Sequence, residues 1–371
     1  MWKGFGATGL IAAFLLSAGE RTALAQRVGP VLVFLVAVTV LADIAALAGV
    51  FDALAAAATR AGRGHTRWLF VLLMVLATGT TILFSLDTTA VLVTPIVIAV
   101  ARSIDVPAWP FALAVLWLAN TGSLLLPVSN LTNLLAMHGL GLATHDYTVR
   151  MWRPALVAIG VTMLALLLLF RRVLAGRHRM PPRPQPHDRV FLVGAGLAIA
   201  CFVALLAANA TPALAAGIAA GLALAVAVVR GHPSQLRSLF PWRLIVTTVG
   251  MFLTVAAVAD LGLRGLVMHL LGGHPTALAV AAGSAALANV LNNLPAYLLV
   301  EQVVPHAQLP AVLLGTNLGP IVLPWASLAT LLWAERVRRA GEQVQWRTVM
   351  FAGAVLAPLL IVSSVLALPS A

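Results

Sequence analysis

The chain has very few charged residues and a single cysteine. Only 9% of its 371 residues are Asp, Glu, Lys or Arg, whereas an ordinary soluble domain has roughly a quarter. Hydrophobic residues make up 61% of the sequence and the mean hydropathy is +1.01, which places the chain in a lipid bilayer. Cys201 alone cannot form an internal disulfide or a polythiolate metal site. We interpret it as a small packing residue and expect no cofactor.

The motifs of several enzyme classes are also absent. The sequence has no Gly-Lys-Ser/Thr phosphate loop, no His-Glu-x-x-His zinc pattern and no Gly-x-Ser-x-Gly nucleophile elbow. ATP hydrolysis within the chain and intramembrane hydrolysis are therefore unsupported, and we expect a protein that is not an enzyme.

Long apolar segments fill most of the sequence. With their flanks, most reach the roughly 20 residues of a spanning helix; they cover residues 31–41, 155–170, 191–206, 213–229 and 349–366. They lack the strict alternation of barrel strands, so the sequence predicts an all-α polytopic membrane protein. From lengths alone we expect about ten or eleven transmembrane helices plus two re-entrant hairpins.

The net charge of +12 comes from arginines in short connections, which indicates membrane topology and not nucleic-acid binding. The positive-inside rule places residues 60–67, 171–189, 230–243 and 335–347 in the cytoplasm. It also predicts a cytoplasmic N-terminus and an outside C-terminus, in a multi-pass protein of the plasma or inner membrane. Residues 1–26 resemble a signal peptide in outline, but Glu20 and Arg21 fit poorly before a cleavage site, so we favour an uncleaved helix.

A Pro-rich, basic linker at residues 171–189 divides the chain near its middle. On both sides of the linker an apolar span with an acid near its end is followed by a polar break and then by a Gly- and Pro-containing interruption. This repeated order is typical of a transporter with two inverted repeats. We expect an N-terminal helix and loop (1–28), a first repeat (29–170), the cytoplasmic linker (171–189) and a second repeat (190–371).

Each predicted repeat contains one polar interruption of an apolar segment. Asn120 and Asn317 both lie seven residues before a proline, and a polar residue follows three residues after that proline. Such breaks are tolerated at membrane depth only where protein or a water-filled cavity satisfies the helix ends. Paired breaks predict a substrate site between the repeats. The candidate binding residues are Asn120, Thr121, Gly122, Ser123, Ser129, Asn130, Thr132, Asn292, Asn293, Asn317, Gly319, Ser327 and Thr330. Alternatively, the asparagines tie broken helix ends to the surrounding protein.

Asp87 is the main candidate for proton coupling, since it has apolar sequence on both sides and no nearby basic residue. An ionised Asp at the bilayer centre costs about 2.5–3.5 kcal/mol, so we expect it to face a cavity. The alternative is a structural Asp that accepts hydrogen bonds at a helix N-terminus. Asp43 and Asp260 end apolar runs in the two halves, and are either second protonatable groups or interfacial residues.

Several blocks resemble the bacterial arsenical-pump membrane protein family, the arsenite and antimonite efflux permeases. This family lies in an ion-transporter superfamily that includes the divalent anion:sodium symporters. The matching blocks are residues 87–99, 128–133, 249–253, 292–295, 318–320 and 327–333. The resemblance implies a helical inner-membrane carrier, often dimeric, that expels trivalent arsenic or antimony hydroxides in exchange for protons, with or without a separate ATPase subunit.

The chain departs from that family at three places. The permeases typically carry acids where this chain has Asn120 and Asn317, and a Lys where it has Ile321, and the N-terminus looks one span short. The loss of these acids leaves Asp87 as the main proton carrier. It also keeps open a sodium- or proton-coupled transporter of small carboxylates or inorganic anions. A third interpretation, from another class, is a non-transporting membrane scaffold that binds a soluble partner through the 171–189 loop.

Overall fold

The computed structural model describes residues 2–178, 188–231, 239–258, 265, 267–268 and 275–369. These residues form helices and no strand, apart from one isolated bridge between His65 and Arg177. The prediction of an all-α protein is confirmed. In the first half the helices are α1 (Trp2–Leu15), α2 (Ala18–Leu47), α3 (Val50–Ala61), α4 (Thr66–Leu83), α5 (Leu86–Ser103), α6 (Trp109–Thr121), η1 (Gly122–Leu124), η2 (Pro127–Ser129), α7 (Leu131–Gly139), α8 (Thr144–Leu169) and η3 (Val173–Ala175). In the second half they are α9 (Arg189–Ala207), α10 (Pro212–Val229), α12 (Trp242–Val258), α14 (Ala277–Leu291), α15 (Asn293–Val300), η5 (His306–Gln308), α16 (Leu309–Leu318), η6 (Gly319–Ile321), α17 (Leu328–Arg339) and α18 (Trp346–Leu366).

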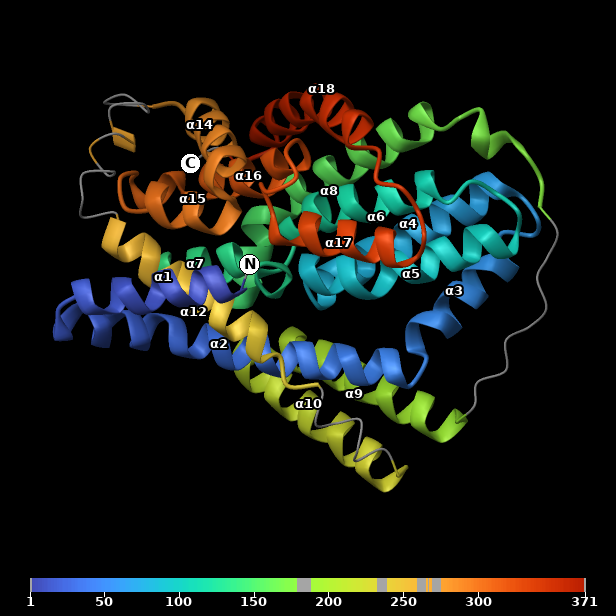
Figure 1. Cartoon of the computed structure of the whole chain (residues 1–371), viewed down its shortest axis with the longest axis horizontal. Helices are drawn as coiled ribbons and strands as arrows, with labels where there is room; N and C mark the ends of the chain where they lie inside the picture. The colour runs from blue at the N-terminus through green and yellow to red at the C-terminus, as the bar shows by residue number, and fades with distance from the viewer. Residues whose placement is uncertain are drawn as a thin grey trace.

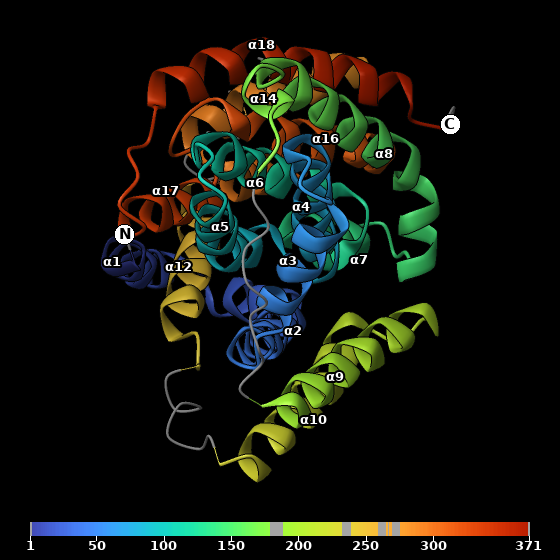
Figure 2. The same ribbon diagram turned by 90° about the vertical axis from the view of Figure 1, so that its right-hand side faces the viewer.

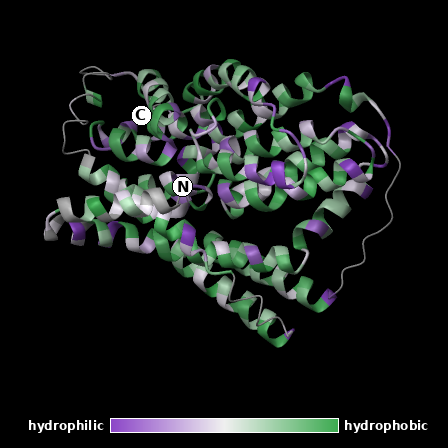
Figure 3. Ribbon diagram, viewed as in Figure 1, coloured by the Kyte–Doolittle hydropathy of each residue, from purple (hydrophilic) through white to green (hydrophobic). Residues whose placement is uncertain are grey.

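Seven of the described helices are long and apolar enough to cross a bilayer: α2, α4, α5, α8, α9, α10 and α18. Two shorter apolar helices, α12 and α14, accompany them. Apolar residues make up most of each long helix, as Figure 3 shows. The chain is therefore a multi-pass membrane protein.

Helix α2 passes through two positions that the sequence singled out. The Ala-Leu-Ala stretch at residues 23–25, which resembles a cleavage site, lies inside it, and so does the expected boundary between residues 28 and 29. Helix α2 packs along α10, and α9 packs on α10. These three helices lie together on one side of the molecule (Figures 1 and 2).

Each half contains the same order of elements beyond this group. A helical hairpin is followed by a broken helix and a long helix: α4–α5, α6–α7 and α8 in the first half, and α14–α15, α16–α17 and α18 in the second. Both breaks fall at the two polar interruptions that begin at Asn120 and Asn317, where the sequence predicts them.

The two broken helices run in opposite directions. The end of α7 at Gly139 lies near Leu309, where α16 begins. The connection after α17 meets the end of α5, because the Arg102 guanidinium donates two hydrogen bonds to Glu342 Oε1 (2.7 and 3.1 Å). This antiparallel arrangement is the one expected of inverted repeats.

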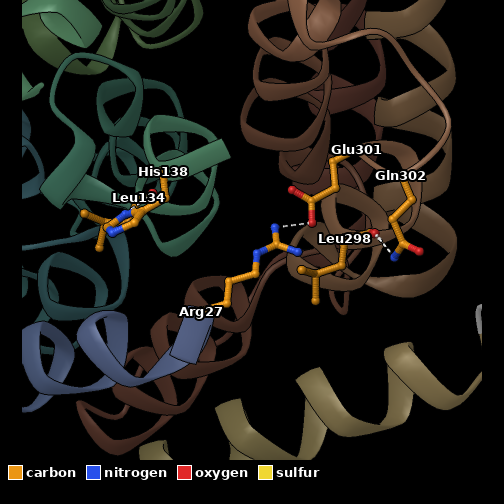
Figure 4. A network of polar contacts seen from close by, with 6 residues as sticks. All are labelled: Arg27, Leu134, His138, Leu298, Glu301 and Gln302. Carbon is orange, nitrogen blue, oxygen red and sulfur yellow. Dashed lines mark hydrogen bonds and ion pairs between the residues drawn. The ribbon is translucent and has the colours of Figure 1, made fainter. Parts of the chain in front are cut away.

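An ion pair links α2 to the second hairpin. Arg27 of α2 pairs with Glu301, which directly follows α15, and the Glu301 side chain is only 7% exposed (Figure 4). Few other contacts join these two helices, so the ion pair fixes the end of the hairpin against α2.

Small residues allow the backbones of the second hairpin and the second broken helix to pack in direct contact. A Cβ at Gly315 would lie 2.2 Å from the Ala281 carbonyl oxygen, and one at Gly319 would lie 2.6 Å from Ala285 Cβ. Gly315 on α16 and Gly319 directly after it form a GxxxG pattern, which is typical of close helix contacts in membranes. This contact positions the break that follows α16.

Candidate functional site

The first break forms because the backbone tightens after Thr121. Gly122–Leu124 and Pro127–Ser129 are short 3-10 turns, and Asn130 then adopts an extended conformation (φ −153°). The Asn130 side chain accepts a hydrogen bond from Thr132 N (3.3 Å) and so caps the restarted helix α7.

The second break has the same construction with one difference. Helix α16 passes into the 3-10 turn Gly319–Ile321, and Ser327 is extended (φ −141°) where α17 begins. The Ser327 side chain accepts no capping hydrogen bond. The first N–H groups of α17 are therefore without this side-chain cap.

Two asparagines satisfy backbone groups that the breaks release. Asn133 Nδ2 donates to Ser123 O (2.5 Å) and to Leu126 O (3.2 Å). In the second half Asn289 Nδ2 donates to Gly319 O (2.9 Å), and Asn289 Oδ1 accepts from Leu323 N (3.1 Å). Asn289 is not among the residues predicted from the sequence, although an Asn three residues before Asn292 in an apolar segment is a usable signal.

The tip of each hairpin is tied to the broken helix of its own half. Ser129 Oγ donates to Ile82 O (3.0 Å). Asn292 Nδ2 donates to Trp325 O (2.9 Å), and Asn293 N donates to Ala326 O (2.9 Å). The hairpin tips and the breaks are therefore held together.

The N-termini of four helices consequently meet around one small cavity of about 30 Å³. Helices α5, α7, α15 and α17 all begin there, and α12 closes one side. The lining residues are Leu86, Asp87, Asn130, Leu131, Leu244, Thr248, Met251, Asn292, Asn293, Leu294, Ser327 and Leu328. Four converging helix N-termini give the cavity a positive potential, which the Asp87 carboxylate offsets.

Two polar atoms of the lining residues are left free. Asp87 Oδ1 and Ser327 Oγ are buried and have no hydrogen-bond partner within the described part of the chain. Buried polar atoms are normally paired, so these two call for a solute or water. The other three N-termini are capped by Ser85, Asn130 and Asn292. The cavity thus offers one carboxylate acceptor, one hydroxyl and the uncapped start of α17.

A larger cavity of about 540 Å³ adjoins this site. The two share Asp87, Leu244 and Leu328 in their linings. The larger one is also lined by Asp43, Glu335, Arg243 and Arg336, among others. Asp43 and Asp87 therefore line the same charged cavity, which we call the vestibule.

The structure divides the predicted site residues into two groups. Asp87, Asn130, Asn292, Asn293 and Ser327 line the small cavity. The remaining predicted binding residues are buried but are not in its lining: Asn120, Thr121, Gly122, Ser123, Ser129, Thr132, Asn317, Gly319 and Thr330. Asp260 lies outside the described residues.

Asn317 joins the two halves directly. Its Oδ1 accepts from Ser123 Oγ (3.2 Å) and from Asn130 Nδ2, while its Nδ2 donates to Asn133 Oδ1 (3.2 Å) and to Leu313 O (2.9 Å). Its counterpart Asn120 donates to Leu116 O (2.9 Å). These contacts agree with the alternative interpretation of the asparagines, in which the Asn317 amide ties broken helix ends to the surrounding protein.

Three further cavity residues lie on a helix that is not predicted from the sequence to take part in binding. Leu244, Thr248 and Met251 lie on α12. The Thr247-Thr248 pair was the available signal, since it interrupts an apolar run. No group of three or more His, Cys, Asp or Glu side chains that could hold a metal ion occurs among the described residues.

Hairpins and broken helices that meet at a small polar cavity define a membrane transporter. The chain belongs to the citrate transporter family (CitMHS), which it matches over residues 2–330. It is 28% identical to the arsenical pump membrane protein of Escherichia coli K12 over 326 residues, covering 80% of this chain and 76% of that protein. It is also 25% identical to an uncharacterized transporter of Mycobacterium tuberculosis, covering 85% and 80%. The YdaH transporter of Alcanivorax borkumensis has a similar fold, with a TM-score of 0.57 at 15% identity, covering 95% of this chain and 88% of that one.

Proposed function

We propose that the protein exports arsenite and antimonite hydroxides in exchange for protons, with Asp87 as the group that carries the proton. The observation behind this proposal is Asp87 Oδ1, which has no hydrogen-bond partner among the described residues and lies in a cavity between four helix N-termini. The similarity to arsenical pump membrane proteins supports the choice of substrate.

The size of the cavity favours a small solute. Its volume of about 30 Å³ accepts roughly two or three water-sized groups, since a single water needs about 10–15 Å³. This is the scale of a pyramidal trihydroxide. A tricarboxylate would require the helices to move apart.

The exchange follows from the chemistry of the free atoms. A neutral trihydroxide donates one O–H to ionised Asp87 Oδ1 and accepts hydrogen bonds from Ser327 Oγ and the start of α17. A proton that arrives from outside converts Asp87 into a carboxylic acid, which removes the charged acceptor and releases the solute. Loss of that proton to the cytoplasm restores the carboxylate for the next solute. Since Cys201 lies on α9 and outside the cavity lining, no thiolate there holds the metalloid too tightly to leave.

Everted membrane vesicles test this function directly. Arsenite should accumulate inside the vesicles when a proton gradient is applied. A sodium gradient should not replace the proton gradient, and citrate should not accumulate in place of arsenite. Cells that lack their own pump should gain arsenite resistance and hold less arsenic. Unchanged arsenic accumulation with verified membrane expression would refute the proposal.

A second candidate is a sodium- or proton-coupled transporter of small carboxylates or inorganic anions. Four helix N-termini directed at one cavity favour an anion, and the family description names citrate. Sodium-dependent dicarboxylate uptake that survives Asp87→Asn would favour this function over arsenite export. Membership of a transporter family sets the scaffold interpretation aside.

We also propose an inner-membrane orientation with the N-terminus and residues 171–189 in the cytoplasm and the C-terminus outside. Reporter fusions at residue 180 and at the C-terminus should give opposite compartments. A homodimer and a separate cytoplasmic ATPase subunit stay as expectations from the family resemblance. Co-purification and cross-linking of the full chain test both.

A further inference from the structure

Two short connections form a basic surface outside the linings of both cavities described above. Residues 60–67 and 171–178 contain six arginines and no Asp or Glu. We call these two segments the basic platform. All six arginines are exposed: Arg60, Arg63, Arg67, Arg171, Arg172 and Arg177.

The two segments of the platform are hydrogen-bonded to each other. Thr66 N donates to Gly176 O (3.3 Å), and His178 N donates to Gly64 O (2.9 Å). Arg177 Nη2 lies 3.2 Å from His65 Nε2. Gly64 has φ +77°, and a Cβ there would lie 3.2 Å from His178 O, so the close approach favours glycine. The arginines are thus carried by a fixed backbone, and a ligand need not order the loops when it binds.

The platform carries an excess of unpaired positive charge. No ion pair involves any of its six arginines within the described ranges. By contrast, Arg102, Arg230 and Arg339, elsewhere in the chain, each pair with an acid. Repulsion among these charges is relieved by an anionic partner.

The platform also lies at the end of the membrane-spanning helices. Helix α4 begins at Thr66 within the platform, and α8 ends at Leu169, two residues before it. Trp68, on the first turn of α4, is 62% exposed, which is typical of a residue at the headgroup level of a bilayer. An anion that binds here therefore lies in the plane of the lipid headgroups.

We propose that the basic platform binds the phosphate groups of anionic phospholipids. Arginine pairs with phosphate through two parallel N–H donors, so several arginines on a fixed backbone select anionic over zwitterionic headgroups. Basic clusters at the cytoplasmic ends of spanning helices are a recognised form of lipid site. The position beside Trp68 favours a lipid phosphate over free phosphate or an acidic soluble protein.

Native mass spectrometry of the purified full chain tests this inference. The protein is titrated with phosphatidylglycerol and, separately, with phosphatidylcholine. The wild type should retain the anionic lipid preferentially. The triple variant Arg67→Gln, Arg171→Gln and Arg172→Gln should weaken that preference by roughly tenfold or more, since each basic residue near an anionic surface contributes substantially to binding.

A matched control removes the same charge elsewhere. Arg150, Arg153 and Arg338 are also exposed and lie outside the platform. Their replacement by Gln should leave lipid selectivity unchanged. Thermal unfolding in phosphatidylcholine should be equal for both variants and the wild type; if the platform variant fails to fold, the wild-type titration still decides.

Three results would overturn the proposal. One is equal retention of the two lipids by the wild type, which would leave a soluble acidic partner as the better explanation of the platform. Another is an equal loss of selectivity in the control variant. The third is complete displacement of the anionic lipid by millimolar inorganic phosphate, which would identify free phosphate as the ligand.

Discussion

Replacement of Gly315 by alanine should destabilise the protein through a single methyl group. The added Cβ would lie 2.2 Å from Ala281 O, 2.6 Å from Ser284 Cβ and 2.9 Å from Ala285 N. Two of these contacts are with backbone atoms, so no side chain can rotate away. Helices α14 and α16 would have to separate by about 1 Å to restore ordinary contact distances.

The expected cost is a balance of two terms. Overpacking of a close helix contact costs about 1–3 kcal/mol. Alanine in place of glycine inside a helix returns up to about 1 kcal/mol. We therefore expect a net loss of about 1–2 kcal/mol, together with slower transport, because α16 carries Asn317 and leads into the second break.

Gly217 provides the matched control. It lies in α10, and a Cβ there has no atom within 4 Å. Gly217→Ala should leave stability unchanged or raise it slightly. Thermal unfolding of both variants in one detergent measures the difference, and a Gly315→Ala protein as stable as Gly217→Ala would refute the packing argument.

The remaining substitutions test the contacts between elements. Asn317→Ala leaves Asn130 Nδ2 and Asn133 Oδ1 buried without this partner. The variant should lose about 2 kcal/mol of stability in thermal or denaturant unfolding, a value between those for one interhelical hydrogen bond and for two orphaned groups. Unchanged stability would contradict the role of Asn317 as a link between the halves. Arg27→Gln leaves the Glu301 carboxylate buried without its cation and should cost about 3 kcal/mol, whereas Arg27→Glu combined with Glu301→Arg should recover part of that loss. No recovery in the exchanged pair would show that the ion pair itself contributes little.

The sequence was sufficient to predict the elements of the transport core. Glycine and proline at residues 122, 127, 319 and 324 mark the two breaks, because each acts through its own backbone and needs no knowledge of the fold. The candidate residues at the start of α5 and α15 were recognised for a similar reason. The polar residues Asp87 and Asn292-Asn293 interrupt apolar sequence at a cost that only a cavity or a helix cap offsets.

The sequence does not predict which asparagines line the cavity and which connect the two halves. Asn130 and Asn317 both belong to the predicted breaks, yet only Asn130 lines the cavity. Asn130 precedes the first turn of a helix whose N-terminus points at the site. Asn317 lies one turn before a break, where its amide reaches the other half of the protein. The direction of each side chain depends on how the two halves pack, which local sequence does not contain.

The vestibule was missed for the same reason. Arg243 and Arg336 were assigned to topology because they lie in basic connections, and both line the larger cavity with Asp43. The position of Arg336 beside Asp87 follows from the packing of α17 on α5, and Arg243 reaches the same cavity from α12. The contact between α17 and α5 joins residues far apart in the sequence.

The most direct test of the central claim separates proton coupling from substrate binding in Asp87→Asn. Wild-type protein in everted vesicles should accumulate labelled arsenite when a proton gradient is imposed, and should also exchange internal for external arsenite without a gradient. Since asparagine is neutral, like protonated Asp87, and cannot carry the proton, the variant should lose gradient-driven accumulation and should exchange arsenite only at higher concentrations than the wild type needs. Gradient-driven accumulation by Asp87→Asn at the wild-type level would contradict the account.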